Sequence, residues 1–259
     1  KFASASSESA PLVIDTCGPW IWKSGWAAIW WNLNVQLSYM PMYSSNRIEV
    51  GRSLFNGLRR IYDSGALRAN AGDRPGITIG RSTDYLGFGS WGDEYGNLPW
   101  TLHSLWKDWA YSRDPSVRKA LKPMLRDAAE YVISLLVEGP DGKLHMPPSR
   151  SPEYADDRLL ADANYSLMAL DWTLRTLLQL DQEDGTQDAQ NDRWRKTLAR
   201  LPAFPADEHG FKVSAEQAFE KSHRHYSHLL AVYPFHTINP DQGAEARQLI
   251  QRSVDRWIG

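Results

Sequence analysis

The sequence predicts an all-α protein whose helices form hairpins arranged in a ring, an α/α toroid that this chain would leave incomplete. Helical spacing of apolar residues recurs along the chain, whereas strand patterns are weak. Two stretches without periodicity, 65–96 and 138–160, are too long to be plain connectors. Alternating helices and long loops favour loops gathered on one rim of a ring. About eight helices are expected, fewer than the roughly twelve of six hairpins.

The N-terminal residues differ in composition from the rest. Ser and Ala dominate the first ten residues, so residues 1–19 are predicted to be a linker or extended lead-in. Residues 20–259 are predicted to be one partial (α/α)6-barrel domain. The first helix is expected over 26–43, with an irregular start at its asparagines. The next spans 47–63, where apolar residues fall close to helical spacing.

The remaining helices follow the two long loops. Residues 98–112 and 115–137 are predicted to form a helical pair, and Pro115 matches the preference of proline for the first turn of a helix. After the loop at 138–160, whose prolines exclude a regular helix, four more helical segments are expected. They span 162–180, 192–201, 225–233 and 244–258.

Composition excludes several classes of protein. Hydrophobic residues at 42% and charged residues at 23% are typical of an ordinary globular chain. A formal charge of −2 gives no electrostatic reason to expect nucleic acid or an anionic membrane as partner. No apolar run approaches the roughly 20 residues of a membrane helix. Cys17 is the single cysteine, so no disulfide framework is expected.

The two ends of the chain indicate a fragment of a longer protein. The chain starts without Met and without the apolar core of a signal peptide, and residues 244–258 are still helical in pattern where it stops. We therefore expect residues 1–259 to be an interior piece, with native termini elsewhere.

The densest polar cluster is Glu220-Lys-Ser-His-Arg-His-Tyr-Ser-His228, directly before an apolar run. Burying so many polar side chains is costly unless something binds them. Two further features accompany it: the motif Pro148-Ser-Arg-Ser-Pro-Glu153, and a tryptophan-rich segment that leads into Asn32 and Asn34. The tryptophans of that segment are Trp20, Trp22, Trp26, Trp30 and Trp31. Flat aromatic faces suit pyranose rings, so these features predict a sugar-binding cleft that contains an acid.

Glu153 is the candidate proton donor. It lies in a proline-braced loop, where a carboxyl group can be directed into a cleft and its pKa raised by desolvation. A glycosidic oxygen is a poor leaving group and requires such an acid. The alternative is an exposed loop glutamate. Asp156 and Asp157 are expected to be surface charges or helix-start residues.

Asn32 and Asn34 are candidates for orienting a water molecule. Side chains two apart on a regular helix diverge by roughly 200°, so a shared site requires irregular backbone or a position at the first turn. An amide cannot act as a base at neutral pH, but it can both donate and accept a hydrogen bond. Local capping and turn formation remain the alternative.

Arg224 and His225 are candidates for binding sugar hydroxyls. His225 and His228 would share one helix face, and with His223 their spacing also invites a zinc site. The nearby glutamate of a His-Glu-x-x-His pattern is missing, so neither a metal nor another cofactor is expected. Satisfied core histidines are the alternative.

Four segments resemble glycoside hydrolase family 95, in the order seen there. They are Trp31-Asn-Leu-Asn-Val-Gln-Leu-Ser-Tyr-Met-Pro41, Leu98-Pro-Trp-Thr-Leu-His-Ser-Leu-Trp106, Pro148-Ser-Arg-Ser-Pro-Glu153 and His223-Arg-His-Tyr-Ser-His-Leu-Leu-Ala-Val-Tyr-Pro234. The resemblance covers about residues 20–258. It implies a six-hairpin (α/α)6-barrel hydrolase that acts with inversion on 1,2-α-L-fucosides or α-L-galactosides. It also implies an oligosaccharide or polysaccharide substrate and a secreted or periplasmic location.

The resemblance carries roles to individual residues. Glu153 resembles the general acid, and Asn32 and Asn34 resemble the pair that helps to activate the attacking water. Arg224 and His225 resemble sugar-binding residues. Trp100 corresponds to an aromatic wall of the pocket. All six are expected to line one pocket, with the acid and the water-activating groups about 6.5–9.5 Å apart.

The sequence also departs from the family pattern. A Gln-Ile-Asp-like segment with the catalytic base is absent, so that base is expected beyond Gly259 and residues 1–259 alone are expected to be inactive. Trp30 stands where fucosidases of the family have a histidine, and Met40 where a tryptophan is expected, so the choice of sugar stays open.

Two rival functions fit parts of the pattern. A polysaccharide lyase on an α/α toroid could use Asn34, His225 and Tyr226 and would not need Glu153. A non-catalytic carbohydrate-binding protein would keep the tryptophans and tolerate loss of Glu153.

Overall fold

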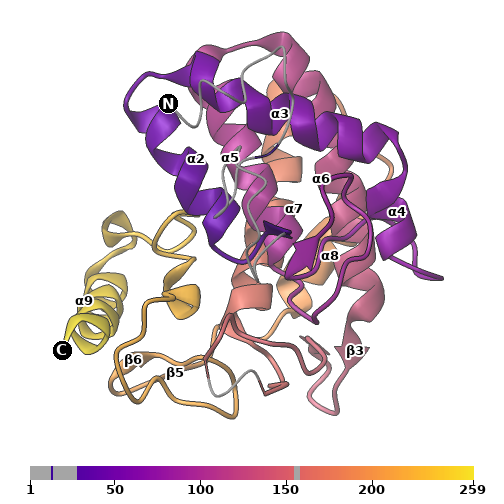
Figure 1. Ribbon diagram of the computed structural model, residues 1–259. Coiled ribbons are helices and arrows are strands. Elements are labelled where there is room, and N and C mark those ends of the chain that lie inside the picture. The colour runs from indigo at the N-terminus through magenta and orange to yellow at the C-terminus, as the bar shows by residue number, and fades with distance from the viewer. Residues whose placement is uncertain (1–12, 14–27, 155–157) are drawn as a thin grey trace. The chain divides into compact units, whose positions relative to one another are not determined.

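A computed structural model describes Val13 and residues 28–154 and 158–259 of the chain (Figure 1). The described residues divide into two compact units. The first comprises those up to Gly92 together with Asn97–Tyr131. The second comprises Asp93–Gly96 and Val132–Gly259.

The first unit is held together by helices that bury apolar faces against each other. Helix α2 (Asn34–Ser44) contacts both α3 (Ile48–Asp63) and α5 (Asn97–Ser112), as Figure 1 shows. Leu58 at the centre of α3 has no exposed surface. The buried amide of Gln36 on α2 donates to the hydroxyl of Thr101 on α5 at 3.0 Å, which fixes the register of these two helices.

The predicted proline start of a long helix is confirmed. Helix α6 (Pro115–Leu135) begins at Pro115, and the carboxylate of Asp114 accepts hydrogen bonds from the amide and the hydroxyl of Ser116, at 2.8 and 2.7 Å. Such a side chain satisfies amides that the first turn of a helix leaves without partners. Helix α4 (Ala66–Asn70) lies inside the long segment that was expected to lack regular structure.

The expected helix over 26–43 is wrong in its first part. Residues 29–30 form strand β1 (Ile29–Trp30), which pairs antiparallel with β2 (Ser82–Thr83). The indole of buried Trp31 donates to Thr83 at 2.9 Å. These contacts are about 50 residues away in sequence, and they outweigh the local helical spacing. The helix therefore begins only at Asn34.

The second unit contains helix α7 (Asn164–Asp184), which is buried on nearly all sides in its first half. It ends at Gly185, whose left-handed φ of 62° closes the last turn. Helix α8 (Asn191–Arg200) then packs against α7. Two short hairpins complete this part: β3 (Val137–Glu138) with β4 (Leu144–His145), and β5 (Ala206–Asp207) with β6 (Gly210–Phe211).

The C-terminal helix α9 (Ala244–Ile258) lies on hairpin β5–β6 (Figure 1). A Cβ added at Gly210 would come within 2.5 Å of the hydroxyl of Ser253, so only glycine permits this close approach. The amide of Phe211 donates to the same hydroxyl at 2.8 Å. The predicted bounds of α9, 244–258, are confirmed.

The helix predicted over 225–233 is wrong. Only a short 3-10 turn forms there, η2 (Ser227–Leu229), and a second one follows at η3 (Pro240–Gln242). Backbone groups of the segment bond elsewhere: the amide of Ala231 contacts the sulfur of Met168 at 3.3 Å, and its carbonyl accepts from Ile238 at 2.9 Å. These tertiary contacts use groups that a helix would need for its own hydrogen bonds.

The predicted all-α class is confirmed, since every strand named above has only two residues. The division into residues 1–19 and 20–259, and the placing of the two long loops on one rim, stay predictions.

Candidate active site

The loop that carries Glu153 is fixed from both sides although it is not helical. Ser149 and Leu160 exchange two backbone hydrogen bonds at 3.0 and 2.9 Å. The hydroxyl of Ser149 contacts that of Ser166 on α7 at 3.2 Å. Arg150 donates its amide to the carbonyl of Asp93 at 2.8 Å and forms an ion pair with the same residue at 2.9 Å. These contacts account for the Ser-Arg part of the motif and anchor residues 149–150.

Glu153 occupies a left-handed backbone conformation with φ of 54°. Its side chain is 25% exposed, so the carboxylate is partly open to solvent. One carboxylate oxygen, Oε2, receives both a guanidinium nitrogen of Arg224 and, at 3.3 Å, the Nε2 atom of His225. Glu153 is therefore not the free surface glutamate that was its alternative.

Arg224 and His225 differ in exposure although they are adjacent. The side chain of Arg224 is 67% exposed, whereas that of His225 is 5% exposed. The amide of His225 donates to Nδ1 of His223 at 3.1 Å, and the two rings lie 5.3 Å apart. The arrangement brings an exposed guanidinium and a buried imidazole to the same carboxylate oxygen.

Helix α9 fixes the segment before these residues. The indole of Trp257 donates to the carbonyl of His223 at 2.8 Å, and the hydroxyl of Ser222 donates to the carbonyl of Trp257 at 2.7 Å. Arg256 donates to the carbonyls of Phe219 and Glu220, at 2.9 and 3.2 Å.

His228 does not share a helix face with His225, contrary to expectation, because the segment is not helical. Its ring is buried and stacks on Phe219 at 3.9 Å. Burial, and secondarily the charge of His223, lower the pKa of His228 to about 3, so the imidazole is neutral at physiological pH. His228 packs in the core, but it is not the satisfied core histidine of the alternative, because neither ring nitrogen has a hydrogen bond among the described residues.

The other predicted site residues belong to the first unit. Asn32 lies in the turn before α2 and Asn34 is the first residue of that helix, so they flank the first turn as expected. Asn32 is 1% exposed, and its side-chain nitrogen has no hydrogen-bond acceptor among the residues that the structure describes. Trp100 is 3% exposed in the interior of α5. Convergence of these three with Glu153 on one pocket stays a prediction.

Aromatic side chains near the asparagines are only partly described. Trp30 is half-buried and meets Trp91 edge-on at 6.4 Å, and Trp91 is 50% exposed beneath the guanidinium of Arg81. Met40 is half-buried on α2. Predictions on Cys17, Trp20, Trp22, Trp26, Asp156 and Asp157 fall outside the described residues.

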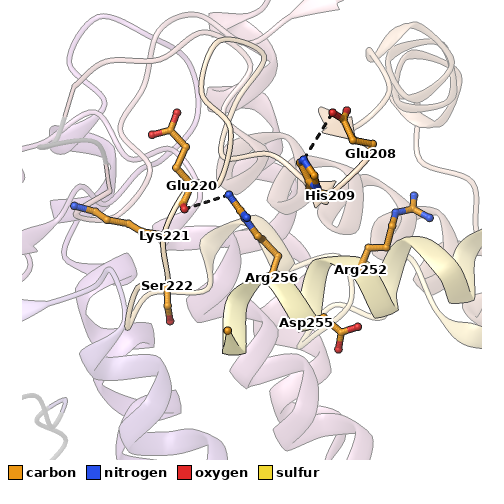
Figure 2. A pocket seen from close by; sticks show the side chains of 9 residues that line it. Glu208, His209, Glu220, Lys221, Ser222, Arg252, Asp255 and Arg256 are labelled. Carbon is orange, nitrogen blue, oxygen red and sulfur yellow. Dashed lines mark hydrogen bonds and ion pairs between the residues drawn. The ribbon is translucent and has the colours of Figure 1, made fainter.

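A hollow of about 570 Å³ lies beside α9 (Figure 2). Charged side chains line it, including Glu208, Lys221, Arg252 and Arg256. In Figure 2, Arg256 reaches toward Glu220 and His209 toward Glu208. No tryptophan, tyrosine or phenylalanine is among its described lining residues, so it offers no flat face for a sugar ring.

Some residues were not singled out from the sequence. Ser151 and Tyr154, on either side of Glu153, are buried and are hydrogen-bonded to residues 220–228, the histidine segment. Glu94 is a carboxylate in the second unit with 1% exposure. Glu94 stands out because it is a charged residue that is buried. The sequence does not reveal this burial, because there Glu94 belongs to an isolated Asp-Glu pair in a loop.

Within residues 28–154 and 158–259, no three His, Cys, Asp or Glu side chains are grouped so that they could hold a metal ion. In the same residues, no helix combines the length and the apolar character needed to cross a membrane.

Comparison with known proteins gives three likenesses. Residues 2–258 match the sequence model of the glycosyl hydrolase family 95 catalytic domain. A curated relative, "Alpha-L-fucosidase 2" of Arabidopsis thaliana, is 21% identical over 246 residues, covering 87% of this chain and 29% of the relative. A solved chain, "Putative kojibiose phosphorylase from human microbiome", is similar with a TM-score of 0.57 at 11% identity, over 87% of this chain and 35% of that one. This chain thus spans less than a third of the length of the curated relative.

At 11% identity the likeness to the solved chain concerns the fold alone. Together with the family match, it confirms an all-α fold of the six-hairpin glycosidase type.

Proposed function

Because the chain belongs to glycosyl hydrolase family 95, we propose that it carries the acid half of an inverting glycoside hydrolase. The protein would remove a terminal α-linked fucose- or galactose-type sugar from an oligosaccharide or polysaccharide. The observation that carries the proposal is that Arg224 and His225 both contact one carboxylate oxygen of Glu153. The name of the Arabidopsis thaliana relative, an alpha-L-fucosidase, supports the fucose-type sugar.

Glu153 would act as general acid. Its proton passes to the glycosidic oxygen while the bond from that oxygen to the anomeric carbon breaks, and the leaving sugar departs as a neutral alcohol. In the free protein, Arg224 contacts the oxygen that would carry this proton. The exposed arginine must therefore leave Oε2 before the acid can act. Sugar hydroxyls, which accept from a guanidinium, provide the new partner.

His225 would stay in place while Arg224 moves. Its buried ring approaches Glu153 at 3.3 Å and can keep the carboxyl group oriented or donate to a sugar hydroxyl. The buried imidazole would thus keep the acid oriented, and the exposed guanidinium would bind the substrate.

Asn32 and Asn34 would position the water that attacks the anomeric carbon. Among the described residues the buried side-chain nitrogen of Asn32 has no acceptor, which supports this role, because a buried amide donor is costly to leave unbonded unless a ligand or water uses it. The proton of that water would pass to a carboxylate expected beyond Gly259. Trp100 would support the pocket wall from within α5. We further propose that the helical hairpins form part of an (α/α)6 barrel and that the protein is secreted or periplasmic.

The polysaccharide lyase is less well supported. It needs Tyr226 or His225 as a base, and burial raises the pKa of the Tyr226 phenol well above its ordinary value. At neutral pH a smaller fraction of this phenol is then in the phenolate form that a base catalyst requires.

The test is Glu153→Gln in the complete protein that contains these residues. Release of the terminal sugar from an α-L-fucosyl or α-L-galactosyl oligosaccharide should fall by about 10²–10⁴-fold, the usual contribution of a general acid. An aryl glycoside with an activated leaving group needs less protonation and should lose much less. The matched control is Glu138→Gln, which neutralises a carboxylate that is 63% exposed in the same unit.

Three outcomes would contradict the proposal. Near-normal release by Glu153→Gln would remove the acid assignment. An unsaturated product that absorbs in the ultraviolet would indicate the lyase. Sugar binding by the wild type without any cleavage would indicate a non-catalytic binding protein.

A further inference from the structure

The residues on either side of Glu153 are both bonded to the segment that carries its partners. Two positions before it, the hydroxyl of Ser151 contacts that of Ser227 at 2.6 Å, and both residues are buried. Directly after it, the hydroxyl of Tyr154 accepts the backbone amides of Glu220 and Lys221. These two contacts fasten the acid loop to the histidine segment at two points, one on each side of Arg224 and His225.

The hydroxyl of Tyr154 is occupied inside the protein. It accepts the amide of Glu220 at 2.8 Å and that of Lys221 at 3.2 Å, and the residue is 5% exposed. The ring stacks on Phe219 at 5.2 Å and meets His223 edge-on at 5.5 Å. Tyr154 therefore does not face a ligand, and any effect it has on chemistry must pass through its neighbours.

The conformation of Glu153 explains why such fastening is needed. A left-handed backbone costs a residue other than glycine on the order of 1–3 kcal/mol and persists only where the surroundings impose it. Proline at 152 cannot supply a backbone donor to hold the turn. The amide of Tyr154 closes the turn by donating to the carbonyl of Ser151 at 3.2 Å, and the side-chain contacts of Ser151 and Tyr154 fasten the turn on both sides.

We propose that Tyr154 is a positioning residue for the acid, with Ser151 as the second point of attachment. Its hydroxyl holds residues 220–221 so that His225 meets the carboxylate of Glu153, and it holds the turn that presents this carboxylate. The inference rests on the proposed role of Glu153 as general acid.

The experiment is Tyr154→Phe in the complete protein, which keeps the ring and removes only the hydroxyl. For an oligosaccharide with a poor leaving group, kcat should fall by about 10–100-fold, because a misplacement of about 1 Å can have that effect on a reacting group. For an activated aryl glycoside, the fall should be no more than about 3-fold, since that substrate depends little on the acid. KM should stay within about 2-fold, because Tyr154 does not touch substrate.

The matched control is Tyr62→Phe, which removes a tyrosine hydroxyl that donates to Asp127 at 2.7 Å in the first unit. It should leave the ratio of the two rates unchanged. If each of the two variants, Tyr62→Phe and Tyr154→Phe, lowers the rates for both substrates by the same factor, the effect is one of general stability and the inference is wrong.

A double variant tests whether Tyr154 acts through Glu153. Adding Tyr154→Phe to Glu153→Gln should cause no further loss, because residues that act as one unit are not additive. A further loss equal to that of Tyr154→Phe alone would overturn the positioning role while leaving the acid assignment intact.

A structural readout separates this inference from the proposed function. If the wild type cleaves no glycoside, the proposed function fails, and a crystal structure of Tyr154→Phe still decides whether Tyr154 positions Glu153. Loss of the left-handed φ at residue 153 or of its contact with His225 supports the positioning role. An unchanged loop would overturn it.

Discussion

Acid should destabilise the protein through His228, the buried histidine of the candidate site region. Its imidazole is 1% exposed and neither ring nitrogen has a hydrogen bond among the described residues. In the unfolded chain the same ring titrates near its ordinary pKa of 6.5, whereas burial lowers the folded-state pKa to about 3. Between these values the unfolded chain binds a proton that the folded chain excludes. The stabilising effect of the neutral ring is thus complete above pH 6.5 and is lost progressively as the pH falls toward 3.

The difference between pKa values of 6.5 and about 3 corresponds to a loss of about 5 kcal/mol in the free energy of unfolding over the whole titration. At pH 5 only part of the interval has been crossed, and the loss is about 2 kcal/mol. Such a loss is a large fraction of the 5–15 kcal/mol typical of domain stability, so it should be measurable well before acid unfolds the chain.

The measurement is urea unfolding of the 259-residue chain at pH 7.5 and pH 5, for wild type and for His228→Phe. Phenylalanine keeps a flat ring against Phe219 and cannot titrate. The wild type should lose about 2 kcal/mol more than the variant between the two pH values, and this comparison cancels any constant cost of repacking. The control is His209→Gln, which replaces an imidazole that is 63% exposed and should follow the wild-type pH dependence. Equal losses in wild type and His228→Phe would refute the reasoning.

Two further predictions concern the first unit. Burial raises the pKa of Asp108 to about 6 despite its ion pair with Arg52 at 3.3 Å, so the folded state binds its proton more tightly than the unfolded state. The free energy of unfolding of Asp108→Asn should therefore rise relative to wild type by about 1–1.5 kcal/mol between pH 5 and pH 8 in urea titrations; a flat difference would contradict this. Gly76→Ala should cost about 1–3 kcal/mol more than Gly142→Ala in thermal unfolding. Both glycines have positive φ, but only at Gly76 would a Cβ meet a carbonyl, that of Asp127, at 2.1 Å; equal costs would show that packing there can relax.

Local sequence patterns correctly predicted helices that are defined by an apolar face or by a residue at their first turn. Helix α9 has the bounds 244–258 expected from apolar spacing, and α6 begins at Pro115 because the prohibition against proline does not apply at a first turn. Residues 29–30 and 225–233 were predicted wrongly as helical for a common reason. Their backbone and side-chain groups bond to residues distant in sequence, and single-sequence spacing contains no information on those partners.

The candidate site divides in the same way. Glu153, Arg224 and His225 could be named as candidates, because they stand in compact motifs with the residue types that the proposed chemistry needs, and the structure brings the three side chains together. Ser151 and Tyr154 could not, because their partners lie 76 and 66 residues away and because serine and tyrosine have many ordinary roles. For the asparagines, side-chain geometry left two options open, irregular backbone or the first turn of a helix, and the structure has Asn32 in the turn before α2 and Asn34 as its first residue.

The dense bonding of the acid loop has a consequence for its motions. The amides of Ser149, Arg150, Tyr154 and Leu160 all donate to carbonyl groups inside the same unit. These four amide hydrogens should exchange with deuterated solvent as slowly as those of a buried helix, on timescales set by cooperative opening of the unit. If the acid needs freedom during turnover, that freedom lies in the rotamers of Arg224, which change in nanoseconds, and not in opening of the chain around Glu153.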